Sequence, residues 1–474
     1  MREASDGSGC SRLRSPCRSA GGCGSEAPVL AAGGAAEFPF TDNPIVGASF
    51  WHGRLTAVQV MWRYVALLVW PARLSNDYSY PQIQLATGSA IDWLGVALLV
   101  GGVLLALWQG RRNRALLFFA ALAFITFLPV SNLLFATGTI MGERLVYLPS
   151  AGLAALVALG TATLGASGRR RQIATAIVAI LVVAYGARTA ARNRDWTSDL
   201  TLWRSAVAAA PASAKAHRAL AEALYDADPS HANLDDVIAS ADRAVALLEP
   251  LPDEQNTFQA FRQAGAYLLD KTAQIGDSDS QANAESMRLY SRALHLLDRA
   301  VVIARLGASQ LPNGSIEPEA DAQRLRAAAI LGLKNPSLAL NAATRSRLLS
   351  PMHPLGYHLS ASALLEMHRD EEAVMTLLTG SIVTGDRGLG QEAMALYRDG
   401  VDREGCAVVG TGSALALNPQ CATVVRHTCI ASAAAYQIFK KAGQTARADD
   451  ARRTALESFA CPADLMERSN SLVP

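Results

Sequence analysis

The stretch "DWLGVALLVGGVLLALWQ" (92–109) decides the fold, because it contains no charged residue after Asp92. A helix that crosses a bilayer needs about 20 mostly apolar residues. Trp93 and Trp108 stand near the two ends of the run, where aromatic side chains anchor a helix at the membrane interface. The stretch therefore predicts a membrane-spanning helix and, with it, an all-α fold.

Three more apolar runs follow at short intervals, at 115–134, 149–166 and 173–190. Small residues recur in the last two, as they do in helices that pack closely inside a membrane. Together with the first run, they predict four transmembrane helices within residues 92–190.

Arginines occupy the two shortest gaps between these runs, as "RRNR" (111–114) and "GRRR" (168–171). Short loops with an excess of arginine lie on the cytoplasmic side of a membrane. This rule places 72–91, 135–148 and everything after residue 191 on the outer side. Three arginines beyond the last run oppose that orientation: Arg188, Arg192 and Arg194.

The region before the first span reads differently. The stretch "RLTAVQVMWRYVALLVWPARLS" (54–75) has one apolar face but contains Gln59 and Arg63. An arginine near the bilayer centre costs roughly 2.5–3.5 kcal/mol on insertion scales. An interfacial or re-entrant helix therefore fits better than a true span, which stays the alternative. Residues 36–91 then form one extracytoplasmic loop, and residues 1–35 form a disordered low-complexity tail.

From about residue 195 the chain changes to charged, Ala- and Leu-rich segments that predict antiparallel helix pairs. The stretches "RAAAILGLKNPSLALNAATRSRLLSP" (326–351) and "SASALLEMHRDEEAVMTLLTG" (360–380) align at an offset of 34 residues, which is the tetratricopeptide period. The pattern predicts a tetratricopeptide-like α-solenoid of degenerate repeats over 195–400, with a generic helical domain as the alternative. Such repeats bind an extended chain or another domain. The alignment pairs Ala327 with Ala361 and Ala339 with Ala373.

Residues 401–474 are predicted to form a Cys-containing terminal helical cap. Outside the cytoplasm, four cysteines can form two disulfides in three connectivities. The local pairing Cys406–Cys421 and Cys429–Cys461 is favoured. Zinc binding is the alternative, although the spacings contain no C-x-x-C pair.

Charge and motif content exclude several classes of function. The 43 basic and 41 acidic residues leave a net charge of +2, so nothing argues for nucleic-acid binding. The sequence has no G-x-S-x-G, P-loop or H-E-x-x-H motif, and it predicts no catalytic residue and no metal site. What remains are polar residues on the predicted outer face: Asp77, Tyr78, Glu143, Arg144 and Tyr147.

These residues also have purely structural interpretations. Tyr78 is equally suited to be an interface aromatic, and the long side chain of Arg144 can reach lipid headgroups. Glu143 and Arg144 are adjacent in sequence, and such neighbours do not face each other on a helix. Each therefore needs its own partner, and a phosphate is a natural partner for the arginine.

Three stretches occur in an order that resembles a known family. They are "FTDNPIVGASFWHGRLTAVQVMWRYVALLVWPARLSNDYSY", "LPVSNLLFATGTIMGERLVYLPSAG" and "ARNRDWTSDLTLWRSAV". They look like the second half of the transmembrane-and-tetratricopeptide-repeat proteins. Those are multi-span glycosyltransferases of the C-type fold, and their animal members are protein O-mannosyltransferases that use a dolichyl-phosphate sugar. The resemblance covers about residues 38–210 by motif and the rest by architecture.

The resemblance implies the C-terminal part of a bacterial inner-membrane enzyme whose repeat domain is periplasmic. Such enzymes place their catalytic acidic residues in the first outer loop, after the first span. No apolar run long enough to span precedes residue 50 here. We therefore expect a fragment that lacks the N-terminal catalytic spans and is inactive alone.

On this interpretation, the complete enzyme moves a mannose-like sugar from a polyprenyl-phosphate carrier to a protein or glycan acceptor that the repeats bind. The five outer-face residues would line the donor site, with Arg144 holding the phosphate. No cofactor is firmly implied, although a divalent cation is compatible with the complete enzyme. The alternative is a non-catalytic, membrane-anchored repeat scaffold for protein–protein interaction.

Overall fold

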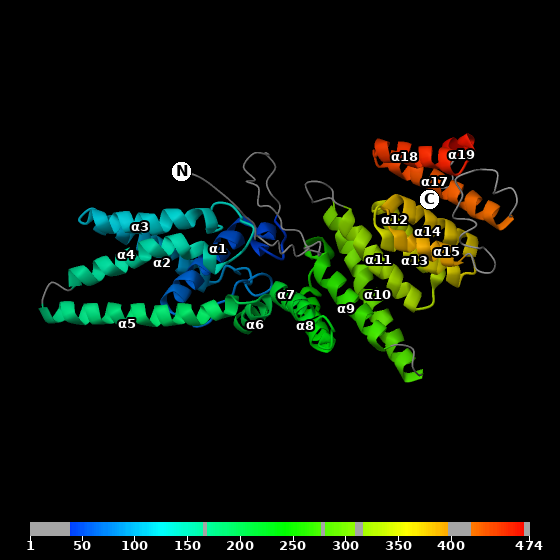
Figure 1. The fold of residues 1–474 in the computed structure, drawn as a ribbon. Helices are drawn as coiled ribbons and strands as arrows, with labels where there is room; N and C mark the ends of the chain where they lie inside the picture. The colour runs from blue at the N-terminus through cyan, green and yellow to red at the C-terminus, as the bar shows by residue number, and fades with distance from the viewer. Residues whose placement is uncertain (1–37, 165–167, 276–279, 309–315, 397–418, 469–474) are drawn as a thin grey trace, which may run out of the picture. The chain divides into compact units, whose positions relative to one another are not determined.

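Every regular element of the structure is a helix, as the sequence predicts (Figure 1). This holds for the residues that the computed structural model describes, all of which belong to one unit beginning at Phe38. The predicted tail at 1–35 lies outside them. The described residues are 38–164, 168–275, 280–308, 316–396 and 419–468.

Three helices are long and apolar enough to cross a membrane, at Ala90–Gly110, Glu143–Ala162 and Gly168–Trp196. Leu94 and Leu104 on the first of them are 56% and 60% exposed, as expected of side chains that face lipid. The elements concerned are α2 (Ala90–Gly110), the 3-10 turn η4 (Glu143–Val146) leading into α4 (Tyr147–Leu164), and α5 (Gly168–Asn193) followed by η5 (Arg194–Trp196).

The second predicted span is shorter than hydropathy suggests. α3 (Arg114–Phe127) continues into η3 (Leu128–Val130) as a short apolar helix. Its length is about 25 Å at 1.5 Å per residue, against roughly 30 Å for the hydrocarbon core. The helix ends early because Pro129 lacks a backbone donor and Asn132 adopts a left-handed backbone with φ 58°. By length and composition, three of the four predicted spans therefore qualify within the described ranges.

α1 (Phe50–Val69) covers most of the doubtful stretch 54–75. It is not among the helices that meet the length and composition of a span. One face is buried, including Leu55 and Val58, while Arg63 stays exposed. An interfacial or re-entrant placement stays the prediction for this helix.

α3 and α4 approach each other closely at one glycine. A Cβ on Gly152 would lie 2.7 Å from the backbone nitrogen of Ala123 and 2.8 Å from the carbonyl oxygen of Phe119. No side chain fits at that distance. The contact is of the small-residue type that lets membrane helices pack through their backbones.

The soluble half is a succession of helices in which each packs against the next. Three apolar core clusters follow one another along the pairs, and in the first of them Phe261, Leu268 and Leu297 are almost wholly buried. The array therefore has the build of an α-solenoid. Its helices are α6 (Asp199–Ala209), α7 (Ala214–Ala227), α8 (Leu234–Leu248), η6 (Asp253–Gln255), α9 (Phe258–Ile275), α10 (Ser280–Ala308), α11 (Glu317–Gly332), α12 (Pro336–Leu349), α13 (Pro354–Glu366), α14 (Asp370–Thr384) and α15 (Arg387–Leu396).

The internal match seen in the sequence corresponds to equivalent places in two helix pairs. α12 begins at Pro336 and α14 at Asp370, 34 residues apart. The paired alanines are all fully buried at the contacts between helices. Small side chains let the helices of each pair lie close together, which explains the repeat of alanine at this spacing. These alanines are Ala327, Ala339, Ala361 and Ala373.

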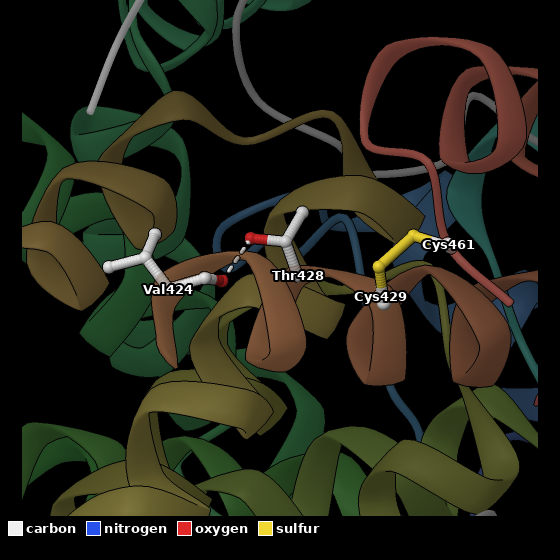
Figure 2. The surroundings of a disulfide bond; sticks show 4 residues. All are labelled: Val424, Thr428, Cys429 and Cys461. Carbon is white, nitrogen blue, oxygen red and sulfur yellow. Dashed lines mark hydrogen bonds between the residues drawn. A yellow bond between two sulfur atoms is a disulfide. The ribbon is translucent and has the colours of Figure 1, made fainter. Parts of the chain in front are cut away.

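The C-terminal helices are α17 (Pro419–Lys441), α18 (Thr445–Ser458) and α19 (Ala463–Arg468). A disulfide joins Cys429 on α17 to Cys461, just before α19 (Figure 2). This pairing is the one that the sequence favours. Cys406 and the side chain of Cys421 lie outside the described residues.

Candidate functional site

The Glu143 cluster consists of Ser75, Tyr78 and Glu143, and it joins η4 to the loop between α1 and α2. The Glu143 Oε1 atom accepts hydrogen bonds from the Ser75 backbone nitrogen at 2.7 Å and from the Tyr78 hydroxyl at 2.7 Å. The Ser75 nitrogen also donates to the Tyr78 hydroxyl oxygen at 3.1 Å. Two of the five predicted site residues, distant in sequence, are therefore in direct contact.

Tyr78 is a fixed, neutral donor in this cluster. Its side chain is buried, and burial is the main reason why the pKa of Tyr78 is raised above its ordinary value. The hydrogen bond to the negatively charged Glu143 raises this pKa further, and the positive charge of Arg192 only partly opposes it. The hydroxyl therefore keeps its proton at neutral pH and continues to donate to Glu143.

α1 holds the same turn from the other side. The Tyr64 hydroxyl donates to the Gly142 carbonyl at 3.1 Å and accepts from the Gly142 nitrogen at 2.8 Å. Gly142 immediately precedes Glu143, so Tyr64 holds the backbone on the N-terminal side of Glu143 while Ser75 and Tyr78 hold its carboxylate. η4 is consequently built as a rigid corner at the entrance to α4.

Asp77 is next to Tyr78 in sequence but binds elsewhere. Its Oδ2 atom accepts from the Ser79 hydroxyl at 2.6 Å and from the Ser213 hydroxyl at 2.6 Å. Ser213 caps the N-terminus of α7 by accepting from the Ala216 nitrogen at 3.0 Å. The structure thus places the Asp77 carboxylate in a joint between the membrane half and the first solenoid helices, while the Asp77 carbonyl accepts from the Ser75 hydroxyl of the Glu143 cluster at 2.8 Å.

Arg144 and Tyr147 are the two predicted site residues whose side chains remain free. Both are exposed, Tyr147 to 84%. Among the described residues, neither side chain takes part in a hydrogen bond or ion pair. The five predicted residues therefore divide into three that build a frame and two that are available to a ligand.

Two arginines at the end of α5 were not predicted as site residues but support the frame. The Arg188 Nε atom donates to the Pro71 carbonyl at 2.7 Å, which fixes the start of the loop that carries Ser75. Arg192 is buried and binds Asp195 and Ser205, both at short distance. Its Nη2 atom is buried without a partner in the described part of the chain.

The sequence did contain a signal for these arginines. In the orientation predicted from the arginine-rich turns, Arg188 and Arg192 lie on the side where the charge rule expects few arginines. Such an exception indicates that a charge is used in a tertiary contact. Here the contacts are with backbone carbonyls and with α6.

An apolar groove of about 450 Å³ runs between α1, α2, α3 and α4. Its walls are almost entirely aliphatic and aromatic, with Leu98, Val103 and Phe124 among the lining residues. Tyr64 and Val146 also line it, so one part of the groove lies against the η4 corner. The groove therefore brings an apolar surface next to the residues that present Arg144.

Cation binding has little support from the side chains. Within the described ranges, no group of three or more His, Cys, Asp or Glu residues is arranged to hold a metal ion. Cys429 and Cys461 are joined in a disulfide, so their sulfur atoms are not free thiolate ligands. Beside this disulfide, the Thr428 hydroxyl donates to the Val424 carbonyl at 2.8 Å (Figure 2).

Comparison with known proteins points to one kind of relative. The chain is 32% identical over 201 residues to "Protein O-mannosyl-transferase TMTC4" of Homo sapiens, a match covering 40% of this chain and 27% of that protein. It is 30% identical over 194 residues to "Protein O-mannosyl-transferase F38B6.6" of Caenorhabditis elegans, covering 40% and 28%. It is 30% identical over 192 residues to "Protein O-mannosyl-transferase Tmtc3" of Drosophila melanogaster, covering 39% and 21%.

The chain thus spans about a quarter of the length of these curated relatives. No family model matches it. The similarity supports a relationship to protein O-mannosyltransferases over the matched part, in agreement with the resemblance seen in the sequence.

Proposed function

We propose that the chain is part of a membrane glycosyltransferase that moves a mannose-like sugar from a polyprenyl-phosphate carrier to a protein or glycan acceptor. The observation that carries the proposal is the apolar groove beside η4, next to an exposed Arg144 whose side chain has no hydrogen-bond or ion-pair partner among the described residues. The similarity to proteins named O-mannosyltransferases supports the same activity.

The apolar groove matches the isoprenoid chain of a polyprenyl-phosphate carrier, and Arg144 matches its phosphate. An isoprenoid chain is apolar and matches the aliphatic walls between α1 and α4. A guanidinium binds a phosphate through two parallel hydrogen bonds, and Arg144 has none of its donors engaged within the described structure. Tyr147, one turn further along, adds an exposed hydroxyl on the same segment.

The remaining predicted residues act on this site through its frame. Glu143 and Tyr78 hold η4 against the loop, so the backbone that carries Arg144 has one orientation. Asp77 fixes the same loop to α7. In this proposal they are positioning residues.

The proposal also includes location and partners. In this proposal the repeats bind the acceptor polypeptide on the periplasmic side of a bacterial inner membrane, and the arginine-rich turns at 111–114 and 168–171 support that orientation. A divalent cation in the complete enzyme stays a prediction.

Photo-crosslinking in nanodiscs tests the donor site without requiring sugar transfer. The probe is a polyprenyl phosphate with a photoreactive isoprenoid chain. We expect Arg144→Ala to lower labelling by about tenfold, since one charge-assisted bidentate contact is lost. Arg194→Ala removes an exposed arginine from η5 and is the matched control, with labelling unchanged.

The outcomes separate the two functions weighed from the sequence. Equal labelling of the wild type and Arg144→Ala eliminates Arg144 as the phosphate ligand. If the wild type is not labelled above the level of an unrelated membrane protein, the non-catalytic scaffold is the better interpretation.

A further inference from the structure

A second pocket, of about 350 Å³, lies on the first helices of the solenoid, where α6, α7 and α8 pack in succession (Figure 1). The volume is at the lower end of the roughly 300–1,000 Å³ that is usual for small-ligand sites. None of its lining residues belongs to the Glu143 cluster or to the apolar groove. Those used below are Arg204 from α6, His217 and Leu224 from α7, and Asp236 and Arg243 from α8.

Two guanidinium groups in this pocket are uncommitted. Within the described residues, the side chains of Arg204 and Arg243 form no hydrogen bond and no ion pair, and Asp236 is not within ion-pair distance of either. Other arginines of the solenoid form ion pairs with acidic side chains. Arg218 pairs with Glu222. The aspartate next to Arg243 in sequence, Asp242, pairs with Arg292 instead.

The other polar groups do not cancel this positive charge. Burial lowers the pKa of His217, the hydrogen bond to the Pro211 carbonyl opposes this, and the nearby charge of Arg243 adds to it, so the net shift disfavours a positive charge on the imidazole. Its Nε2 atom is 3.0 Å from the Pro211 carbonyl oxygen. Asp236 lies in the first turn of α8, where the helix dipole already stabilises a negative charge. The pocket keeps two positive charges against one negative.

The surroundings favour a polypeptide over a lipid headgroup as the source of the anion. From residue 199 to residue 248, all of it described, no large hydrophobic side chain is exposed. Acyl chains attached to a bound headgroup would therefore find no exposed large hydrophobic side chain on α6, α7 or α8, the three helices that line the pocket. A side chain of an extended polypeptide needs only the pocket itself, and repeat arrays bind extended polypeptides along their helices.

We propose that this pocket binds an acidic side chain of a polypeptide, with Arg204 and Arg243 both donating to its carboxylate. This proposal rests on the proposed function in one respect only: the bound polypeptide is taken to be the acceptor of the sugar. The recognition itself needs neither the sugar donor nor Arg144.

Peptide binding to the full chain in nanodiscs of zwitterionic lipid tests the site in the absence of any sugar donor. The probes are fluorescent ten-residue oligomers of glutamate and of glutamine, and anisotropy gives the dissociation constants. We expect the glutamate oligomer to bind at least tenfold more tightly than the glutamine oligomer. The variant R204A/R243A should lose about tenfold of that affinity, since two charge-assisted contacts disappear.

A second variant pair controls for net charge. R288A/R452A removes two exposed arginines from α10 and α18 with the same change in charge, and its affinity should stay within twofold of the wild type. Asp236→Asn should tighten binding by a factor of two to three, because it removes the one opposing charge. Circular dichroism confirms that each variant is folded.

Three results would overturn the proposal. The first is an equal loss of affinity in R204A/R243A and R288A/R452A, which would show non-specific attraction only. The second is equal binding of the glutamate and glutamine oligomers. The third is that R204A/R243A loses affinity only for vesicles that contain an anionic phospholipid and not for the glutamate oligomer. That result would assign the pocket to lipid headgroups. A failure of polyprenyl-phosphate labelling, in contrast, would leave these measurements standing.

Discussion

The Glu143 carboxylate accepts two hydrogen bonds from a loop that lies more than sixty residues earlier in the chain. A half-buried carboxylate loses part of its hydration and must recover it from donors in the protein. Ser75 and Tyr78 supply them, one through the backbone and one through a hydroxyl. These two hydrogen bonds therefore connect the loop to η4 through one atom, the Glu143 Oε1 atom.

Replacing Tyr78 by Phe should lower the free energy of unfolding by about 1.5–3 kcal/mol, because the hydroxyl's hydrogen bond to the charged Glu143 and the one it accepts from the Ser75 nitrogen are both lost. Chemical denaturation of the detergent-solubilised chain measures the change. Tyr147→Phe is the matched control and should have no effect, since that hydroxyl is exposed. Equal stability of wild type and Tyr78→Phe would show that the Glu143 contact contributes nothing.

The sequence could identify these residues but not their partners. Asp77, Tyr78, Glu143 and Arg144 stood out because polar groups beside apolar runs need a reason to be there. Adjacent residues can bind in opposite directions, as Asp77 and Tyr78 do, and that depends on backbone turns that composition does not reveal. The contact between Tyr78 and Glu143 is long-range, so no local pattern predicts it.

At the scale of helices, Gly152 sets the distance between α3 and α4. Gly152→Ala should destabilise the chain by about 1–3 kcal/mol, because the added methyl meets backbone atoms that cannot move aside. Thermal unfolding in detergent is the measurement. Gly160→Ala, on the same helix with open space around its Cα, should be neutral or slightly stabilising. A common effect of both changes would point to helix propensity instead of packing.

The Cys429–Cys461 disulfide connects α17 to the start of α19 across 32 residues. Closing a loop of this length in the unfolded chain contributes about 3 kcal/mol. Reduction should therefore loosen α19 and expose it to limited proteolysis. In C429S/C461S the reductant should have no further effect at this site. Resistance of the reduced wild type to proteolysis would show that packing alone holds α19.

Helix existence was easier to predict than helix length. Hydropathy located α2, α4 and α5 because long apolar runs have few alternatives to a membrane helix. The same measure extended α3 to residue 134, since it gives no weight to Pro129 or to the left-handed backbone at Asn132. The 34-residue offset succeeded in the solenoid because small buried residues must recur wherever helices pack at equal distance.

For the whole molecule, orientation is the prediction with the widest consequences. A reporter enzyme that is active only after export, fused after residue 210, should be active, because both arginine-rich turns are expected on the cytoplasmic side. The same reporter fused after residue 111 should be inactive. An inactive fusion after residue 210 together with an active fusion after residue 111 would reverse the topology and remove the periplasmic acceptor from the proposed function.

The stretches that carry the family resemblance meet in one region of the structure. Asn43 donates to Asn132 at 2.9 Å, which ties the first stretch to the second. The Ser75 hydroxyl in the first stretch donates to the Ala206 carbonyl in the third at 3.5 Å. Much of the recognisable sequence therefore maintains the connection between the membrane helices and the solenoid. This explains why the motifs were specific while their chemistry could not be assigned from sequence.

The Asp77–Ser213 hydrogen bond also bears on the order in which the protein is made. Asp77 accepts a hydrogen bond from Ser213, the N-cap residue of α7, and precedes it by 136 residues. Asp77 lies in the loop between α1 and α2, and this loop is complete only when both helices are in place. During synthesis this acceptor is in place before the ribosome reaches the repeats. We therefore expect the solenoid to begin folding at its membrane end and to grow away from it, with each helix pair docking on the one before.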